Sequence, residues 1–210
     1  MTPSASTVFL VDDDPGVIRA LGILLQAAGY EVRSFSSARE FLSRHDPSVP
    51  GCAVFDVAMP DLDGLELQAS LLKEQVERPV IFITGYGDIP TSVRAMKAGA
   101  VDFLTKPVTD EHLLDAIERA IARDAEARKA SHELELIKAQ LAKLTPREYE
   151  VLTHVIAGKL NKQIAHDLGT VVNTVKVHRS RVMEKLGLKS VADLTRLAQR
   201  AGIEAAKGKF

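Results

Sequence analysis

Short apolar segments that alternate with helical patterns run through the first half of the chain and restrict its fold more than any other feature. Each apolar segment spans four or five residues, which is too short for a helix, and valine, isoleucine and phenylalanine are frequent in them. Runs such as VFLV and VIFI contain no polar residue, as expected of strands buried on both faces of a sheet. We therefore predict five β-strands, at residues 7–11, 31–35, 52–55, 79–83 and 101–104.

Helical patterns between and after these strands favour an α/β fold with a parallel sheet. Strands that alternate with helices pair in parallel, and the helices cover both faces of the sheet. The five-stranded flavodoxin-like fold with strand order 2-1-3-4-5 satisfies this pattern. The helices are predicted at residues 15–28, 38–44, 65–74, 90–98 and 111–123.

The next segment, residues 126–143, is charged and helical. Its apolar residues are spaced alternately by three and four, which predicts either a short coiled coil or an amphipathic helix packed on its own chain. Both alternatives remain open from the sequence. The residues of this apolar seam are Ala127, Ala130, Leu134, Ile137, Leu141 and Leu144.

A second domain is predicted to begin at Thr145. The sequence Thr-Pro-Arg-Glu supplies an N-cap, a proline at the first helical position and a glutamate at the third, which together form a capping box. Helices are predicted at residues 146–157, 162–168, 172–186 and 191–199. The expected organisation is an α/β domain at 1–125, a helical linker at 126–143 and an all-α, four-helix domain at 144–210.

Charge is distributed unequally between the two halves of the chain. Residues 1–125 contain 11 Lys and Arg against 19 Asp and Glu, a balance of 11 − 19 = −8, whereas residues 126–210 contain 16 against 9, a balance of +7. A basic second half favours a polyanionic partner. Cys52 is the only cysteine, so an internal disulfide is excluded, and no signal peptide or apolar run of about 18 residues is present. We expect a cytoplasmic bacterial protein with no membrane partner.

Acidic residues follow two strands that are neighbours in the predicted sheet. Asp12 and Asp13 come after the first strand, and Asp56 comes at the end of the third. Ligands of such sheets bind at the carboxyl ends of the strands, and converging carboxylates need a cation. Mg²⁺ prefers oxygen ligands, so these residues predict a magnesium site. The alternative is helix capping, which accounts for Asp14 before Pro15 but not for its two neighbours.

Two further polar residues follow the fourth and fifth strands. Thr84 ends the fourth strand, and Lys106 comes directly after the fifth. A hydroxyl and an ammonium beside carboxylates and a metal ion fit the transfer of a phosphoryl group, whose oxygens need neutralisation. Alone, Lys106 is explained as an ion-pair partner and Thr84 as a helix cap.

The motifs VDDD, DVAMPDLDG, ITGYGD and DFLTKP resemble those of the receiver domains of bacterial response regulators, over residues 5–125. The resemblance implies that Asp56 accepts a phosphoryl group from a sensor histidine kinase. It also implies that Asp12, Asp13 and Asp56 hold Mg²⁺ with the backbone carbonyl of Ala58, where relatives usually carry arginine. Lys106 is then expected to contact the phosphoryl group.

The same resemblance assigns a switching role to Thr84 and Phe103, whose rearrangement reports phosphorylation in that family. Ordinary core packing is the alternative for Phe103. A cis peptide bond is expected between Lys106 and Pro107, which proline permits. Asp61, Asp63 and Gly64 are similar to a calcium loop, but Leu72 stands where the coordinating glutamate is required, so this segment is predicted to be a turn.

Residues 162–168, a glycine turn and a longer basic helix have the pattern of a helix-turn-helix, whose second helix enters the major groove of DNA. A small bundle with a solvated basic face is the alternative. The motifs LTPREYEVL, NKQIAHDLG, NTVKVHRSRVMEKLG and KSVADL resemble the LuxR-type DNA-binding domain over residues 141–203. The whole chain is similar to the FixJ subfamily of response regulators. The DNA contacts expected from this resemblance are Lys162, Val172, Asn173, Thr174, Lys176, Val177, Arg179 and Ser180.

We thus expect a non-enzymatic transcription factor with Mg²⁺ as its cofactor. Its expected partners are a sensor histidine kinase, double-stranded promoter DNA, RNA polymerase and, on phosphorylation, a second copy of the chain. A phosphohydrolase using Asp56 is an alternative, but the haloacid-dehalogenase pattern requires aspartate where Ala58 stands. Another alternative is a phosphate-sink receiver, which only accepts phosphoryl groups from a kinase. Such a protein would not need the basic domain. Finally, Val171 replaces the usual hydroxyl N-cap of the recognition helix.

Overall fold

A computed structural model describes residues 6–85 and 88–206. The chain divides into two compact units, Met1–Arg128 and Lys129–Phe210. In the described ranges, no helix has both the length and the apolar character needed to span a membrane.

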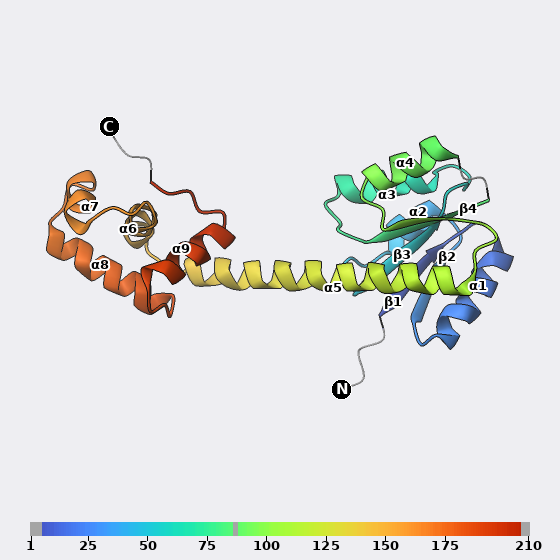
Figure 1. The fold of residues 1–210 in the computed structure, drawn as a ribbon, viewed down its shortest axis with the longest axis horizontal. Helices are drawn as coiled ribbons and strands as arrows, with labels where there is room; N and C mark the ends of the chain where they lie inside the picture. Colours follow the sequence, from blue (N-terminus) through green and yellow to red (C-terminus); the bar gives the residue numbers. More distant parts are fainter. Residues whose placement is uncertain (1–5, 86–87, 207–210) are drawn as a thin grey trace. The chain divides into compact units, whose positions relative to one another are not determined.

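The first unit is built on a five-stranded parallel sheet (Figure 1). Its strand order is β2-β1-β3-β4-β5, which confirms the predicted order. The central strands β1, β3 and β4 are buried along their whole length, as their uninterrupted apolar sequences predict. The strands are β1 (Thr7–Val11), β2 (Glu31–Phe35), β3 (Gly51–Asp56), β4 (Val80–Thr84) and β5 (Asp102–Thr105).

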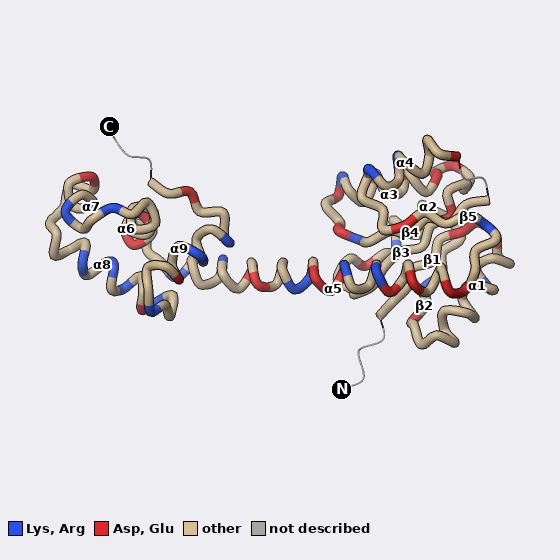
Figure 2. Tube along the Cα trace, in the orientation of Figure 1, with Lys and Arg blue, Asp and Glu red and all other residues tan. Residues whose placement is uncertain are grey.

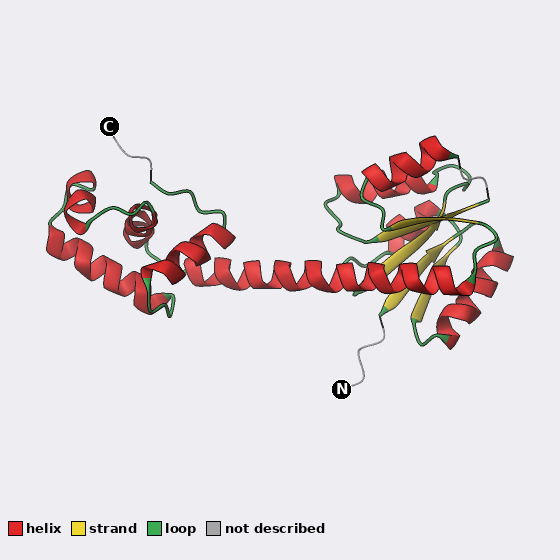
Figure 3. Cartoon of the chain, viewed as in Figure 1, coloured by secondary structure: helices red, strands yellow, loops and turns green. Residues whose placement is uncertain are grey.

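Helices cover both faces of this sheet (Figure 3). Because successive side chains of a strand point to opposite faces, Phe9 and Phe55 belong to one apolar cluster and Val8 and Val54 to the other. Residues of α2, α3 and α4 pack in the first cluster, and residues of α1 and α5 in the second. The helices are α1 (Pro15–Ala27), α2 (Ala38–Arg44), α3 (Gly64–Lys73), α4 (Ile89–Lys97) and α5 (Asp110–Leu141).

Helix α5 is one continuous helix of 32 residues, whereas the sequence predicts a helix at 111–123 followed by a separate linker segment. No glycine or proline occurs between Asp110 and Leu144, so nothing in the sequence ends the helix. Leu141 and Leu144, the last two residues of the predicted seam, pack against the apolar core of the second unit. These two residues of the seam are thus in contact with the core of the second unit.

The second unit contains α6 (Pro146–Ile156), α7 (Asn161–Asp167), α8 (Val172–Lys185) and α9 (Val191–Arg200). The predicted capping box is confirmed, because Thr145 Oγ1 accepts from the Glu148 amide at 3.3 Å and Glu148 Oε2 accepts from the Thr145 amide at 2.9 Å. One apolar core joins all four helices. Its most buried members are Val151, Leu152, Ile164, Val175, Val182, Leu194 and Ala198.

Candidate functional site

The carboxyl edge of the sheet brings together four polar residues that are far apart in the sequence. Asp12 follows β1, Asp56 ends β3, Thr84 ends β4 and Lys106 follows β5. All strands run in the same direction, so their carboxyl ends meet at this edge. Asp12, Asp56 and Thr84 are buried, with at most 6% of each residue exposed.

Lys106 joins the two buried carboxylates. Its Nζ lies 2.7 Å from Asp56 Oδ1 and 3.0 Å from Asp12 Oδ2. The other oxygen of each carboxylate accepts from a backbone amide: Asp56 Oδ2 from Ala58 at 2.6 Å, and Asp12 Oδ1 from Asp14 at 2.8 Å. The orientation of both carboxylates is therefore determined by hydrogen bonds.

Burial and charge act in opposite directions on the ionisation of this site. Burial raises the pKa of Asp12 above its ordinary value, although the Asp14 amide and Lys106 partly offset this effect. Burial lowers the pKa of Lys106, but its hydrogen bonds to Asp56 and Asp12 outweigh burial and raise that pKa overall. Lys106 thus remains an ammonium beside the carboxyl groups of Asp12 and Asp56.

The predicted magnesium ligands are only partly brought together. Asp12 and Asp56 share Lys106, whereas Asp13 is exposed and makes no hydrogen bond or ion pair in the described part of the chain. In residues 6–85 and 88–206, no group of three or more His, Cys, Asp or Glu side chains is arranged to hold a metal ion. The donor set itself consists of carboxylate and carbonyl oxygens, which suits Mg²⁺.

Thr84 and Phe103 lie on adjacent strands. Phe103 is half-buried, and its ring centroid lies 6.1 Å from that of Phe82, within the cluster that α2, α3 and α4 cover. The carbonyl oxygen of Thr84 accepts from the Lys106 amide at 2.7 Å, so the backbone of Thr84 is connected directly to the residue that bonds Asp56. The Lys106–Pro107 peptide bond is cis, as the family resemblance implies.

Gly64 is a residue of this site that sequence reasoning treats only as part of a turn. A Cβ atom at Gly64 would lie 2.4 Å from the carbonyl oxygen of Asp56, so only glycine fits there without displacement of the backbone. Its amide donates to the Val57 carbonyl at 3.1 Å. Asp63 and Glu66 form a capping box at the start of α3. An Asp-Gly-x-Glu sequence soon after a strand is the signal that identifies this tight connection.

The helix-turn-helix predicted in the second unit is formed by α7 and α8. Val175 and Val182 hold one face of α8 in the core. The tube in Figure 2 shows Lys and Arg residues distributed along α8. Of the predicted DNA contacts, Lys162, Asn173, Lys176, Val177 and Ser180 are exposed, and Val172, Thr174 and Arg179 are half-buried.

Two basic side chains of α8 have partners within the fold. Arg179 Nη1 donates to Asn161 Oδ1 at 3.1 Å, and Lys185 Nζ contacts Glu148 Oε2 at 2.6 Å. The side chain of Lys176 has no hydrogen bond or ion pair to another described residue. Helix α8 begins at Val172 with Val171 as its N-cap, and no side chain caps it, as the sequence predicts.

Comparisons with known proteins agree with both halves of this description. The family model for the response regulator receiver domain matches residues 8–118, more than half of the chain. This chain belongs to the response regulators. The family model for bacterial regulatory proteins of the luxR family matches residues 142–198, so this response regulator carries a LuxR-type DNA-binding domain.

Two relatives match this chain over most of its length. Nodulation protein W of Bradyrhizobium diazoefficiens is 46% identical over 94% of this chain and 87% of its own length. Transcriptional regulatory protein FixJ of the same species is 41% identical over 93% and 96%. The name of FixJ describes a transcriptional regulator, in agreement with the predicted class of protein.

Solved structures extend the comparison to the fold. The response regulator StyR is 45% identical, covers 94% of this chain and 100% of its own, and has a TM-score of 0.82. Full-length FixJ from B. japonicum is 41% identical, covers 94% and 97%, and has a TM-score of 0.58. The fold class and the recognition of the chain as a FixJ-like response regulator are thereby confirmed.

Proposed function

We propose that this response regulator is a phosphorylation-controlled transcription factor in which Asp56 accepts a phosphoryl group from a partner sensor histidine kinase. The observation that carries the proposal is the carboxylate of Asp56, oriented at the carboxyl edge of the sheet by Lys106 at 2.7 Å and by the Ala58 amide at 2.6 Å. Each of these bonds leaves lone pairs on the carboxylate, and one of them serves as the nucleophile.

In the transfer, an oxygen of Asp56 forms a bond to phosphorus while the phosphorus–nitrogen bond of the kinase's phosphohistidine breaks. The electron pair of that bond returns to the imidazole, and an acyl phosphate is left on Asp56. Lys106 is placed to pair with a phosphoryl oxygen as negative charge moves toward Asp56. Asp12, Asp13, Asp56 and the carbonyl of Ala58 would hold Mg²⁺, which when bound neutralises phosphoryl oxygens.

A phosphoryl group on Asp56 competes for Lys106, which also bonds Asp12. Because the Lys106 amide donates to the carbonyl of Thr84, a displacement of the Lys106 backbone would also move the end of β4. We assign the switching role to the Thr84 hydroxyl and the ring of Phe103, which lies on the neighbouring strand.

The output is binding of promoter DNA by the second unit. Helix α8 enters the major groove, where Val172, Asn173, Lys176, Val177 and Ser180 face the base edges. Lys162, Thr174 and Arg179 contact phosphates. The phosphorylated protein forms a homodimer that presents two recognition helices to two half-sites, and RNA polymerase is the expected partner at the promoter.

The test is an Asp56→Asn variant incubated with Mg²⁺ and a small acyl phosphate donor. The amide is not a nucleophile, so phosphate incorporation should be lost and the donor should no longer change DNA binding. Phosphate-affinity electrophoresis and gel-shift titration measure the two effects.

Asp115→Asn is the matched control, because Asp115 is an exposed carboxylate on α5. It should behave as the unaltered protein does. Undiminished phosphate incorporation in Asp56→Asn would place the phosphoacceptor at another residue.

A further inference from the structure

A buried polar network connects α5 with the loop between α2 and β3. The side chains of Arg78, two residues before β4, and Asp124, in α5, are 1% and 3% exposed, and Arg78 Nη1 lies 4.0 Å from Asp124 Oδ1. Asp124 Oδ2 accepts from Arg128 Nε at 2.7 Å and from the Gly51 amide at 2.9 Å. We call these three side chains the Arg78–Asp124–Arg128 network.

The two arginines of the network bind the backbone of the α2–β3 loop. Arg128 donates to three consecutive carbonyl oxygens at 2.8–2.9 Å, those of Pro47, Ser48 and Val49. Arg78 donates to the carbonyl oxygens of Gly51 at 2.8 Å and Asp46 at 3.2 Å. Carbonyl oxygens in such a loop need donors when water is excluded, and arginine with its five N–H groups supplies them.

Arg78 also contacts two aromatic rings. Arg78 Nε donates to His45 Nε2 at 3.1 Å, and the guanidinium lies 4.5 Å from the centroid of the Phe9 ring. Burial, with the charges of Arg78 and Arg128 nearby, lowers the pKa of His45 to about 4. The imidazole is therefore neutral near pH 7 and able to accept this hydrogen bond.

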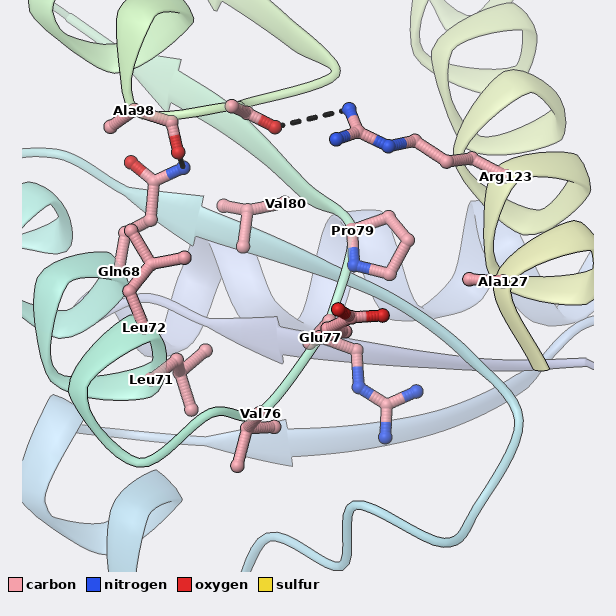
Figure 4. Close-up of a pocket in the computed structure, with 12 residues that line it drawn as sticks. Gln68, Leu71, Leu72, Val76, Glu77, Pro79, Val80, Ala98, Arg123 and Ala127 are labelled. Atoms are coloured by element: carbon pink, nitrogen blue, oxygen red, sulfur yellow. Dashed lines mark hydrogen bonds between the residues drawn. The ribbon is translucent and has the colours of Figure 1, made fainter. Parts of the chain in front are cut away.

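Apolar packing does not hold this part of α5. Within the described residues, the apolar clusters include α5 side chains up to Ile121 and again at Leu141, but none between them. A cleft of about 300 Å³ lies where Arg123 and Ala127 of α5 face Gln68, Val80 and Pro79 (Figure 4).

Polar side chains attach α5 beside this cleft. Arg123 Nη1 donates to the Gly99 carbonyl at 3.1 Å (Figure 4), and Asp124 and Arg128 bind the α2–β3 loop. Residues 123–128 are thus attached to the receiver by side-chain hydrogen bonds and ion pairs. Segments with few buried apolar contacts open locally at lower free energy than the core does.

We propose that the Arg78–Asp124–Arg128 network is a conformational device that fixes residues 123–128 of α5 to the receiver, and that transmission of the phosphorylation signal into the rest of α5 requires it. The part of the proposal that concerns signalling rests on the proposed function. The network lies at the amino edge of the sheet, whereas Asp56 lies at the carboxyl edge. Removal of the network should therefore impair transmission of the signal and leave phosphate acceptance by Asp56 nearly unchanged.

The experiment compares Arg128→Ala and Arg128→Lys with the unaltered full-length protein. Alanine removes all four hydrogen bonds of Arg128, and lysine restores the charge but not the planar set of donors. Amide hydrogen exchange of residues 122–130 should become at least about tenfold faster in Arg128→Ala, because local opening then needs less free energy. Arg128→Lys should lie between Arg128→Ala and the unaltered protein.

Signal transmission is measured in the same proteins. Incorporation of phosphate from an acyl phosphate donor should stay within about twofold of normal. The donor-dependent increase in DNA affinity should fall about tenfold or more, a change within the range that is typical of allosteric coupling. Lys129→Ala is the matched control, because it removes a charge one residue further along the same helix, where Lys129 is exposed. This control should change neither amide exchange nor coupling.

Unchanged exchange of residues 122–130 in Arg128→Ala would overturn the structural part of the proposal. Faster exchange with full retention of the donor-dependent increase in DNA affinity would overturn the signalling part. A protein whose unaltered form accepts no phosphate would instead contradict the proposed function, and the exchange measurement would still decide whether the network holds α5.

Discussion

At the scale of single residues, the phosphoacceptor site depends on Gly64 as well as on its charged groups. An alanine Cβ at this position would lie 2.4 Å from the Asp56 carbonyl oxygen and 3.2 Å from the ring of Phe82. Gly64→Ala must therefore displace the backbone of the phosphoacceptor, and it should lower the free energy of unfolding by about 1–3 kcal/mol. Phosphate incorporation should slow as the Asp56 carboxylate moves. Chemical denaturation and donor-labelling rates measure the two effects.

Gly22→Ala provides the matched control in the same unit. Gly22 lies inside α1, and nothing lies within 4 Å of a Cβ built on it. This substitution should raise stability by about 0.5–1 kcal/mol, because alanine loses less conformational freedom in a helix. A stable, fully active Gly64→Ala protein would show that the loop after β3 accommodates the additional methyl group.

At the scale of elements, the recognition helix α8 begins without a side-chain cap. Its N-cap Val171 has extended backbone angles, φ −95° and ψ 152°, which suit a serine whose hydroxyl accepts from the first turn. Val171→Ser should therefore raise the stability of the second unit by about 1 kcal/mol, visible as a higher melting temperature.

Ser190→Ala is the reference for this capping effect, because Ser190 caps α9 and accepts from the Asp193 amide at 3.1 Å. It should lower stability by a similar amount. The melting temperature could instead stay unchanged in Val171→Ser and fall in Thr170→Ala or Asn173→Ala. That result would show that the helix does not begin at Val172.

A second prediction at this scale concerns the start of α6. The ion pair with Lys185 and the Thr145 amide lower the pKa of Glu148 from 4.5 to about 2, against the effect of burial. A carboxyl whose pKa is lower in the folded state stabilises the fold above pH 4.5, and this contribution is lost as the pH falls toward 2. Glu148→Gln should remove this pH dependence from unfolding curves measured between these values.

Glu150→Gln is the comparison for that experiment, because Glu150 is exposed and forms an ion pair with Arg147 at 2.8 Å. Its unfolding should keep the pH dependence of the unaltered protein. If the free energy of unfolding changes with pH in the same way in Glu148→Gln and in the unaltered protein, the ion pair between Glu148 and Lys185 does not persist in solution.

At the scale of the whole molecule, the proposed response is a change in association. Two recognition helices related by two-fold symmetry match two half-sites of DNA, and a single chain carries one such helix. A phosphodonor with Mg²⁺ should therefore shift the protein from monomer toward dimer at micromolar concentration. Sedimentation velocity measures this shift, and Asp56→Asn should remain monomeric. An unchanged sedimentation coefficient of phosphorylated protein would contradict activation by dimerisation.

Local rules of sequence account for most of the elements and for the residues at the sheet edge. Apolar runs without polar residues identified β1, β3 and β4, and Asp14 and the Thr145–Glu148 box were recognisable as helix starts. The alternation of strands and helices predicted a parallel sheet, and the observed strand order is that of the flavodoxin-like fold that satisfies this pattern. Asp12, Asp56, Thr84 and Lys106 were predictable candidates because each comes at or directly after the end of a strand.

Only the tertiary structure decided which partners these and other residues have. Lys106 bonds both Asp12 and Asp56, and Gly64 lies against the backbone of Asp56. Arg78 and Asp124 are 46 positions apart, and nothing in either segment indicates the other. Helix and strand periodicity describes neighbours along the chain, whereas these contacts depend on how the loops and helices pack against the sheet. The sequence thus determined the fold and the chemistry of its carboxyl edge, and only the tertiary structure decided which side chains attach α5 at the opposite edge.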